Sequence, residues 1–178
     1  KKQLWQIDRL QDWAWNPVVY TQLVGGSIYG LVARDFAPLP KRLQNVAARL
    51  EQFPRLFNQI RKTLEPKRVP QVHVETAIKQ NRGVLSILDN MVRPHLKELS
   101  DDDQRRLTKA METATAAVEE YQKWLESELL VKAGGDFRLG PELYDEKLAL
   151  TLQTDLTRQQ LRDRANSELT RVRSVMYH

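Results

Sequence analysis

Apolar residues recur at steps of three and four along most of the chain, the spacing that places side chains on one face of an α-helix. The clearest stripe follows Ser100, an N-cap residue before three aspartates that complement the positive end of a helix dipole. Its apolar positions step like a heptad seam: Leu107, Met111, Ala114, Val118, Tyr121 and Leu125. We therefore predict one long central helix over about 101–133, which Gly134 and Gly135 end.

Two more stripes lie in 38–99, a stretch that prolines divide. The first stripe consists of Leu43, Ala47, Leu50, Phe53, Phe57, Ile60 and Leu64. Pro54 interrupts it, and because proline has no N–H to donate to the helix ladder, we expect a kink or two abutting helices there. The second stripe predicts a third helix and consists of Val74, Ala77, Ile78, Leu85, Leu88 and Val92. Asn81 lies on this stripe, so it is either a buried group hydrogen-bonded to a neighbouring helix, the commoner case, or a cleft residue.

The first part of the chain, 1–36, is rich in aromatic residues. Burial in a core or at an inter-domain face is the favoured interpretation, and the wall of a peptide-binding cleft is the alternative. Asn16–Pro17 is a capped helix start. No charged residue occurs in Val18–Ala33, yet this stretch is shorter and more polar than the roughly 20 apolar residues of a membrane span. We expect no membrane span, and we expect Gly25–Gly26 to divide the stretch into two buried helical pieces.

The last part of the chain, 140–178, predicts further helices. Thr157 and Gln160 form a capping box for the final helix. The apolar stripe of that helix consists of Leu161, Ala165, Leu169, Val172 and Met176. No Gly or Pro stops the helical pattern at either end of the sequence, so we expect these 178 residues to be a fragment of a longer protein.

No strand-like alternation of five or more residues occurs, so the predicted fold class is all-α. We predict a multi-helix bundle without a sheet, built as a single helical domain over 1–178. Its parts are the aromatic-rich segment 1–36, the proline-divided helices 38–99, the long helix with its end 100–134, and the C-terminal helices 140–178.

Composition excludes several chemistries. The chain has no Cys, which rules out disulfides, Cys-ligated zinc, iron–sulfur clusters and thiol catalysis. None of the three His is followed by Glu, so the helical His-Glu-x-x-His zinc motif is missing. We therefore assign no catalytic, cofactor-binding or metal-ligating residue, and we expect no cofactor in this chain.

A net charge of +5 raises the question of polyanionic partners. Most basic residues are interspersed with acids, and the densest basic stretch, Arg61–Arg68, contains a Glu and no aromatic residue that could stack on a base. A solvated surface explains this pattern best, and we expect no nucleic-acid partner.

One ordered set of segments carries information beyond composition. It comprises Trp15–Tyr20, Arg34–Leu39, Leu43–Glu51, His73–Asn81 and Gly135–Gly140, followed by Tyr144. Together these segments resemble the bacterial domain-of-unknown-function family 885 (DUF885). The resemblance covers essentially the whole chain, and its specificity comes from the order of the segments and not from any single one.

The resemblance implies a helical, zincin-related, metallopeptidase-like parent protein that is longer than this chain. Its zinc-binding His-Glu motif would lie downstream of the matched region, so zinc is expected in the parent only. In such a parent the Glu would polarise a zinc-bound water for attack on an amide carbonyl. Many members look like exported proteins or lipoproteins, which implies a periplasmic or lipid-anchored location, while the cytoplasm stays open as a compartment.

We infer that the chain is the N-terminal helical, cleft-forming scaffold of such a parent and is inactive alone. Its partners would be the rest of the polypeptide and a peptide substrate. His73, Asn81 and Arg138 are polar residues inside the matched segments and are weak candidates for lining the cleft, although a buried structural hydrogen bond is favoured for each. The alternative is a stand-alone helical protein-binding or scaffold module whose apolar groove takes a partner helix.

Overall fold

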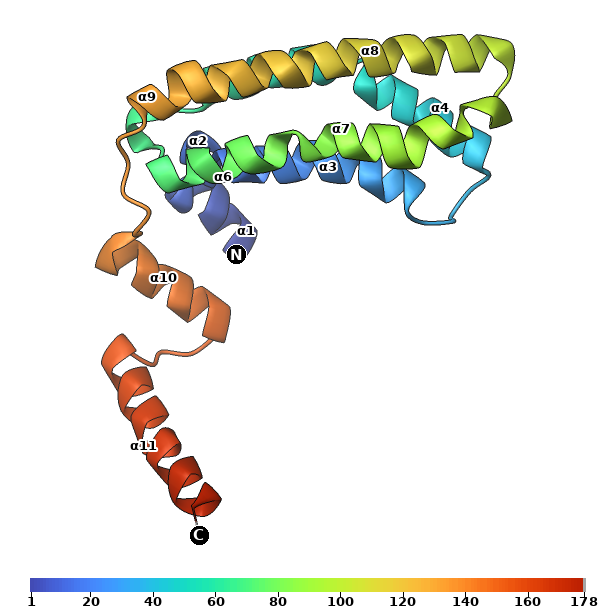
Figure 1. Ribbon diagram of the computed structural model, residues 1–178. Helices are drawn as coiled ribbons and strands as arrows, with labels where there is room; N and C mark the ends of the chain where they lie inside the picture. The colour runs from blue at the N-terminus through green and yellow to red at the C-terminus, as the bar shows by residue number, and fades with distance from the viewer. Residues whose placement is uncertain (178) are drawn as a thin grey trace. The chain divides into compact units, whose positions relative to one another are not determined.

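A computed structural model describes residues 1–177, and most of them are helical (Figure 1). Among these residues the only pairing of extended backbone is one isolated parallel bridge, which confirms the all-α prediction. Contacts divide the chain into a core unit, Asp12–Phe137, and a terminal unit, which joins Lys1–Gln11 to the residues from Arg138 onward. This division does not test the expectation of one helical domain, which stays a prediction.

The core unit is a bundle of helices joined by short turns. Its first half consists of α2 (Asp12–Trp15), α3 (Pro17–Val32), α4 (Leu39–Leu50), α5 (Phe53–Thr63) and the 3₁₀ turn η2 (Pro66–Arg68). Its second half consists of α6 (Gln71–Asn81), α7 (Gly83–Ile87), the π turn η3 (Leu88–Val92), the 3₁₀ helix η4 (Arg93–Glu98), α8 (Asp101–Trp124), the π turn η5 (Leu125–Leu129) and α9 (Leu130–Lys132). The stripe that predicted a third helix thus forms the successive segments α6, α7 and η3, because a turn at Arg82 separates α6 from α7.

α8, η5 and α9 form one continuous helical run from Asp101 to Lys132, which confirms the predicted long helix. This run lies along one side of the core unit, and α8 packs against α4 and α5 (Figure 1). At its start the Ser100 hydroxyl accepts a hydrogen bond from the Asp103 amide at 3.3 Å, as an N-cap does. The run stops at Ala133, whose backbone is extended, directly before the predicted glycine pair.

The heptad seam of the run from Asp101 to Lys132 forms the centre of the core. Its members Leu107, Val118, Tyr121 and Leu125 are each 0% exposed. The ring of Tyr121 stacks on Phe57 with 4.6 Å between centroids and on Trp124 with 5.6 Å. Fully burying a large apolar side chain stabilises a fold by about 1.5–3 kcal/mol, so the seam decides which face of α8 turns inward.

Pro54 separates two abutting helices, which was one of the two expected outcomes. α4 ends at Leu50 and α5 begins at Phe53, with a turn between them. Pro54 lies in the first turn of α5, where a backbone N–H would have no partner within the helix. The proline therefore starts a helix without costing it a hydrogen bond.

The predicted break at Gly25–Gly26 is wrong, because α3 runs through both glycines without interruption. On its inner face Val24 and Ile28 are 1% and 0% exposed. Packing of that face outweighs the about 1 kcal/mol that each interior glycine costs a helix. The stretch is also not fully buried, since Leu23 is 54% exposed and Tyr29, an aromatic residue expected in the core, is 53% exposed.

A buried arginine, which the sequence pattern does not single out, holds the connection from α3 to α4. Arg42 is 6% exposed, and its guanidinium pairs with Asp35 at 2.9 Å. It also donates hydrogen bonds to the carbonyl oxygens of Ala37 at 2.7 Å and Arg34 at 2.8 Å. A further bond of 3.3 Å reaches the carbonyl of Leu31. The last carbonyls of a helix have no partner within it, so Arg42 caps the end of α3.

The segment after α9 lies directly against the connection between η2 and α6. Gly135 donates its N–H to the carbonyl of Val69 at 3.0 Å and forms the isolated bridge with Pro70. A Cβ atom on Gly135 would overlap the carbonyl group of Arg68. Only glycine permits two backbones to approach this closely.

The terminal unit consists of α1 (Lys2–Trp5), the π turn η1 (Gln6–Leu10), α10 (Gly140–Leu152) and α11 (Arg158–Met176). Glu146 of α10 accepts hydrogen bonds from Trp5 Nε1 at 2.5 Å and from the Arg9 guanidinium at 2.7 Å, which ties the start of the chain to α10. The predicted capping box at Thr157 is present. Within residues 1–177, no helix has both the length and the apolar character to cross a membrane.

Candidate functional site

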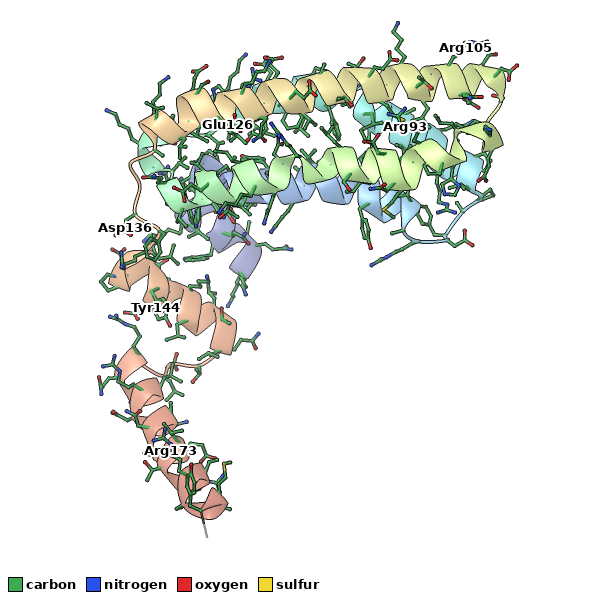
Figure 2. All side chains as sticks on the ribbon, in the orientation of Figure 1. Arg93, Arg105, Glu126, Asp136, Tyr144 and Arg173 are labelled. Carbon is green, nitrogen blue, oxygen red and sulfur yellow. The ribbon has the colours of Figure 1, made fainter. Side chains whose placement is uncertain are left out.

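Asn81 lies at the end of α6 in a buried hydrogen-bond network that joins α6 to α8. It is 1% exposed, and its Nδ2 donates to the carbonyl of Val118 at 3.1 Å and to Oε1 of Gln122 at 3.0 Å. Gln122 in turn donates from Nε2 to the carbonyl of Ile78 at 3.3 Å and to Oε1 of Glu126 at 2.6 Å. Glu126, labelled in Figure 2, is the exposed end of this network. The amide of Asn81 is thus the buried, hydrogen-bonded group that was one of its two expected roles.

This network is built to position helices. Side-chain amides carry no charge, and both donor bonds of the Asn81 amide already have protein acceptors. The only ionisable member is Glu126, at the surface. Sequence reasoning missed Gln122, although its position four residues after Val118 places it beside the apolar seam, the one signal that could have found it.

Asn81→Ala is expected to lower the free energy of unfolding by about 1–3 kcal/mol, because it leaves Gln122 and the Val118 carbonyl buried without their donor. Urea unfolding followed by circular dichroism measures the change. Asn90→Ala is the matched control, since Asn90 is exposed and its side-chain amide donates to Ser86 on its own helical run. The effect of this variant should stay within about 0.5 kcal/mol. Equal losses in the two variants would contradict the structural role of the network.

His73 lies near the start of α6 and stacks on the ring of Trp15, with 5.5 Å between centroids and 21° between planes. Its Nδ1 is buried and has no hydrogen-bond partner among the described residues. Burial lowers the pKa of His73 from its ordinary value of 6.5, so the imidazole is neutral at pH 7. A neutral imidazole can donate or accept a hydrogen bond or bind a metal. Of the three candidates, His73 is therefore the one with the widest choice of binding chemistry.

His73 and Asn81 do not lie together. His73 packs against α2 and Asn81 against α8, more than two helical turns apart on α6. Arg138 belongs to the terminal unit and is exposed. Their role in lining a cleft stays a prediction. In the part of the chain that the structure describes, no group of three or more His, Cys, Asp or Glu side chains is placed to hold a metal ion.

Comparisons with known proteins give the context of these residues. A sequence model of the family described as "Bacterial protein of unknown function (DUF885)" matches residues 1–178. The chain is also similar, at 31% identity and a TM-score of 0.83, to a solved structure described as "a putative lipoprotein of unknown function" from Shewanella oneidensis. That similarity covers 96% of this chain and 31% of the other, so the chain spans about a third of that protein's length. Among curated proteins no significant match is found.

Proposed function

Since the chain belongs to the DUF885 family of bacterial proteins, we propose that it is the N-terminal helical scaffold of a longer, zinc metallopeptidase-like protein, where it forms one side of the substrate cleft and is inactive alone. One observation carries this proposal. The chain aligns over 96% of its length with only 31% of a related structure, so the related protein has about two thirds of its chain outside the region that this fold supplies.

The packing of the core unit supports a scaffold role. Side-chain hydrogen bonds anchor its helices at two places, the Asn81–Gln122 network between α6 and α8 and the Arg42 cap between α3 and α4. A wall of fixed helices is what a cleft needs, because bound substrate must be held in one orientation relative to the reacting groups.

The zinc-dependent part of the proposal rests on the resemblance seen in the sequence. Zinc bound downstream would activate a water for attack on a peptide carbonyl. Of the cleft candidates, His73 has the best support. Its buried Nδ1 has no hydrogen-bond partner within residues 1–177, and a substrate could supply one. Asn81 and Arg138 remain candidates of lower rank. We also propose an exported parent, which the description of the related structure as a lipoprotein supports.

The test compares the 178-residue chain with the full-length protein that contains it. Elemental analysis should find about one zinc per full-length molecule and none in the short chain, and only the full-length protein should cleave a fluorogenic peptide library. One tightly held zinc per short chain would contradict the scaffold role. A full-length protein without zinc would contradict the metallopeptidase and favour the helical binding module.

The same assay tests His73 with a matched control. His73→Phe keeps the stack on Trp15, so the zinc content should not change, while kcat/KM of the full-length protein for peptide should fall by about tenfold. His95→Phe changes an exposed histidine that faces Glu98 on its own helix and should leave kcat/KM unchanged. Equal effects of the two substitutions would remove His73 from the cleft.

A further inference from the structure

α11 carries an apolar stripe that its own unit does not cover. The stripe consists of Leu161, Ala165, Leu169, Val172 and Met176. No residue of α11 is buried, and Leu169, Val172 and Met176 are 49%, 38% and 74% exposed. The stripe keeps its helical spacing from the first turn of α11 to the last, so the whole length of the helix presents one apolar face.

A helix of this kind needs a covering partner. In proteins, tertiary packing of an apolar face supplies most of the stability of a helix such as α11. The ion pairs of α11, Arg158 with Asp145 of α10 and Arg171 with Glu168, are half-exposed surface contacts that contribute little. The stability of α11 therefore has to come from what packs on its stripe.

α10 shapes one end of this surface. A groove of about 920 Å³ lies between α10 and α11, with Tyr144 and Leu148 on one side and Leu161 and Ala165 on the other. Leu161 and Ala165 are also the first members of the stripe, so groove and stripe form one continuous surface. Figure 2 labels Tyr144 on α10 and Arg173 near the far end of α11.

The charges beside the stripe indicate what kind of helix fits. At 100° per residue, Arg162 and Arg173 border one edge of the stripe, while Glu168 and then Arg164 border the other. No ion pair involves these three arginines within residues 1–177. A partner with acidic residues along the edge that faces Arg162 and Arg173 would neutralise these two charges, as charged flanks do in paired helices.

We propose that the stripe of α11 and the groove beside α10 dock an amphipathic helix with one acidic edge from the part of the same polypeptide that lies outside residues 1–178. This rests on the proposed function only in so far as the chain is the scaffold of a longer protein. The related structure shows where such a helix could come from. Only 31% of its chain corresponds to this one, so the rest of that chain contains further segments. Leu, Ala, Val and Met form a narrow seam suited to another helix, and the stripe has none of the Trp or Phe typical of helices that lie in a membrane surface.

Hydrogen–deuterium exchange on the full-length protein and on the 178-residue chain tests the docking. The amides of α11 should exchange at least about 100-fold more slowly in the full-length protein than in the short chain. Zinc content is measured on the same samples. Protection of α11 in a full-length protein without zinc would contradict the metallopeptidase proposal and support the docking proposal. Bound zinc without protection of α11 would contradict the docking proposal and support the metallopeptidase.

Two neighbouring substitutions in the full-length protein separate docking from general destabilisation. Leu169→Asp places a charge in the stripe and should speed exchange across α11 by at least about tenfold. Thr170→Asp adds the same charge on the opposite face of the helix and should leave exchange unchanged. Equal effects of the two variants would overturn the proposal.

The unmodified proteins keep the proposal falsifiable even where a variant does not fold. Rapid exchange of α11 in the full-length protein would overturn it. Equal protection in the short chain would also overturn it, because the cover would then be within these residues or in a second copy. Protection of α11 in the short chain by phosphatidylglycerol vesicles would point to a membrane surface and overturn it as well.

Discussion

Gly135→Ala is expected to lower the free energy of unfolding by about 4 kcal/mol or more, a large part of the 5–15 kcal/mol that stabilises a typical domain. The added Cβ would overlap the carbonyl of Arg68 and lie 3.0 Å from the carbonyl carbon of Val69. Both obstacles are backbone atoms, which cannot rotate away as a side chain can. Relief requires the strand-like contact after α9 to separate from the connection into α6.

The neighbouring glycine provides the control for Gly135. A Cβ on Gly134 would meet only the carbonyl oxygen of Lys67, at 3.7 Å, which is an ordinary van der Waals distance. Gly134→Ala should therefore change the free energy of unfolding by less than about 1 kcal/mol, and it can even stabilise the fold by restricting the unfolded chain. Urea unfolding of both variants by circular dichroism decides the matter. Similar losses at the two positions would show that close backbone approach is not the reason for glycine here.

Arg42→Met is expected to cost about 3 kcal/mol of unfolding free energy. The methionine fills the space of the arginine stem but leaves the carbonyls of Leu31, Arg34 and Ala37 without their donor, and each buried acceptor left unpaired costs about 1–3 kcal/mol. Water that reaches part of the connection from α3 to α4 can bond to these carbonyls, which limits the total loss of unfolding free energy. The same urea titration measures the loss.

Two further variants identify the cause of the Arg42 effect. Lys41→Met removes the same charge from the adjacent, exposed position and should cost less than about 0.5 kcal/mol. Arg42→Lys keeps the charge but replaces a planar fork of donors by one ammonium, so it should recover only part of the loss. A full recovery by lysine would mean that charge, and not the geometry of the cap, stabilises the end of α3.

The spacing of apolar residues predicted helices well where capping residues, helix propensities and that spacing favour the same helix. In α8 the Ser100 cap, the following aspartates and the heptad seam all favour the same helix. In α3 they conflict, because two glycines interrupt an otherwise apolar stretch. Local propensity suggested a break there, and packing of Val24 and Ile28 on the core overrode it.

The candidate site shows the same division. The sequence placed Asn81 on an apolar stripe and left two roles open. Its partner Val118 is 37 residues away, so only the folded chain could show that the amide is fully bonded inside the bundle. His73 gave no sign of its contact with Trp15, a residue on a separate helix.

By itself the sequence determined the helical class, the extent of the long helical run from Asp101 to Lys132 and the caps at Ser100 and Thr157. The reason is that helical spacing and capping act between residues at most a few positions apart. Only the tertiary structure decided that Asn81 joins two helices, that Arg42 is buried and that Gly135 cannot carry a side chain. Each of these depends on which backbone segments meet in space. Such meetings follow from the path of the whole chain, which no local pattern encodes.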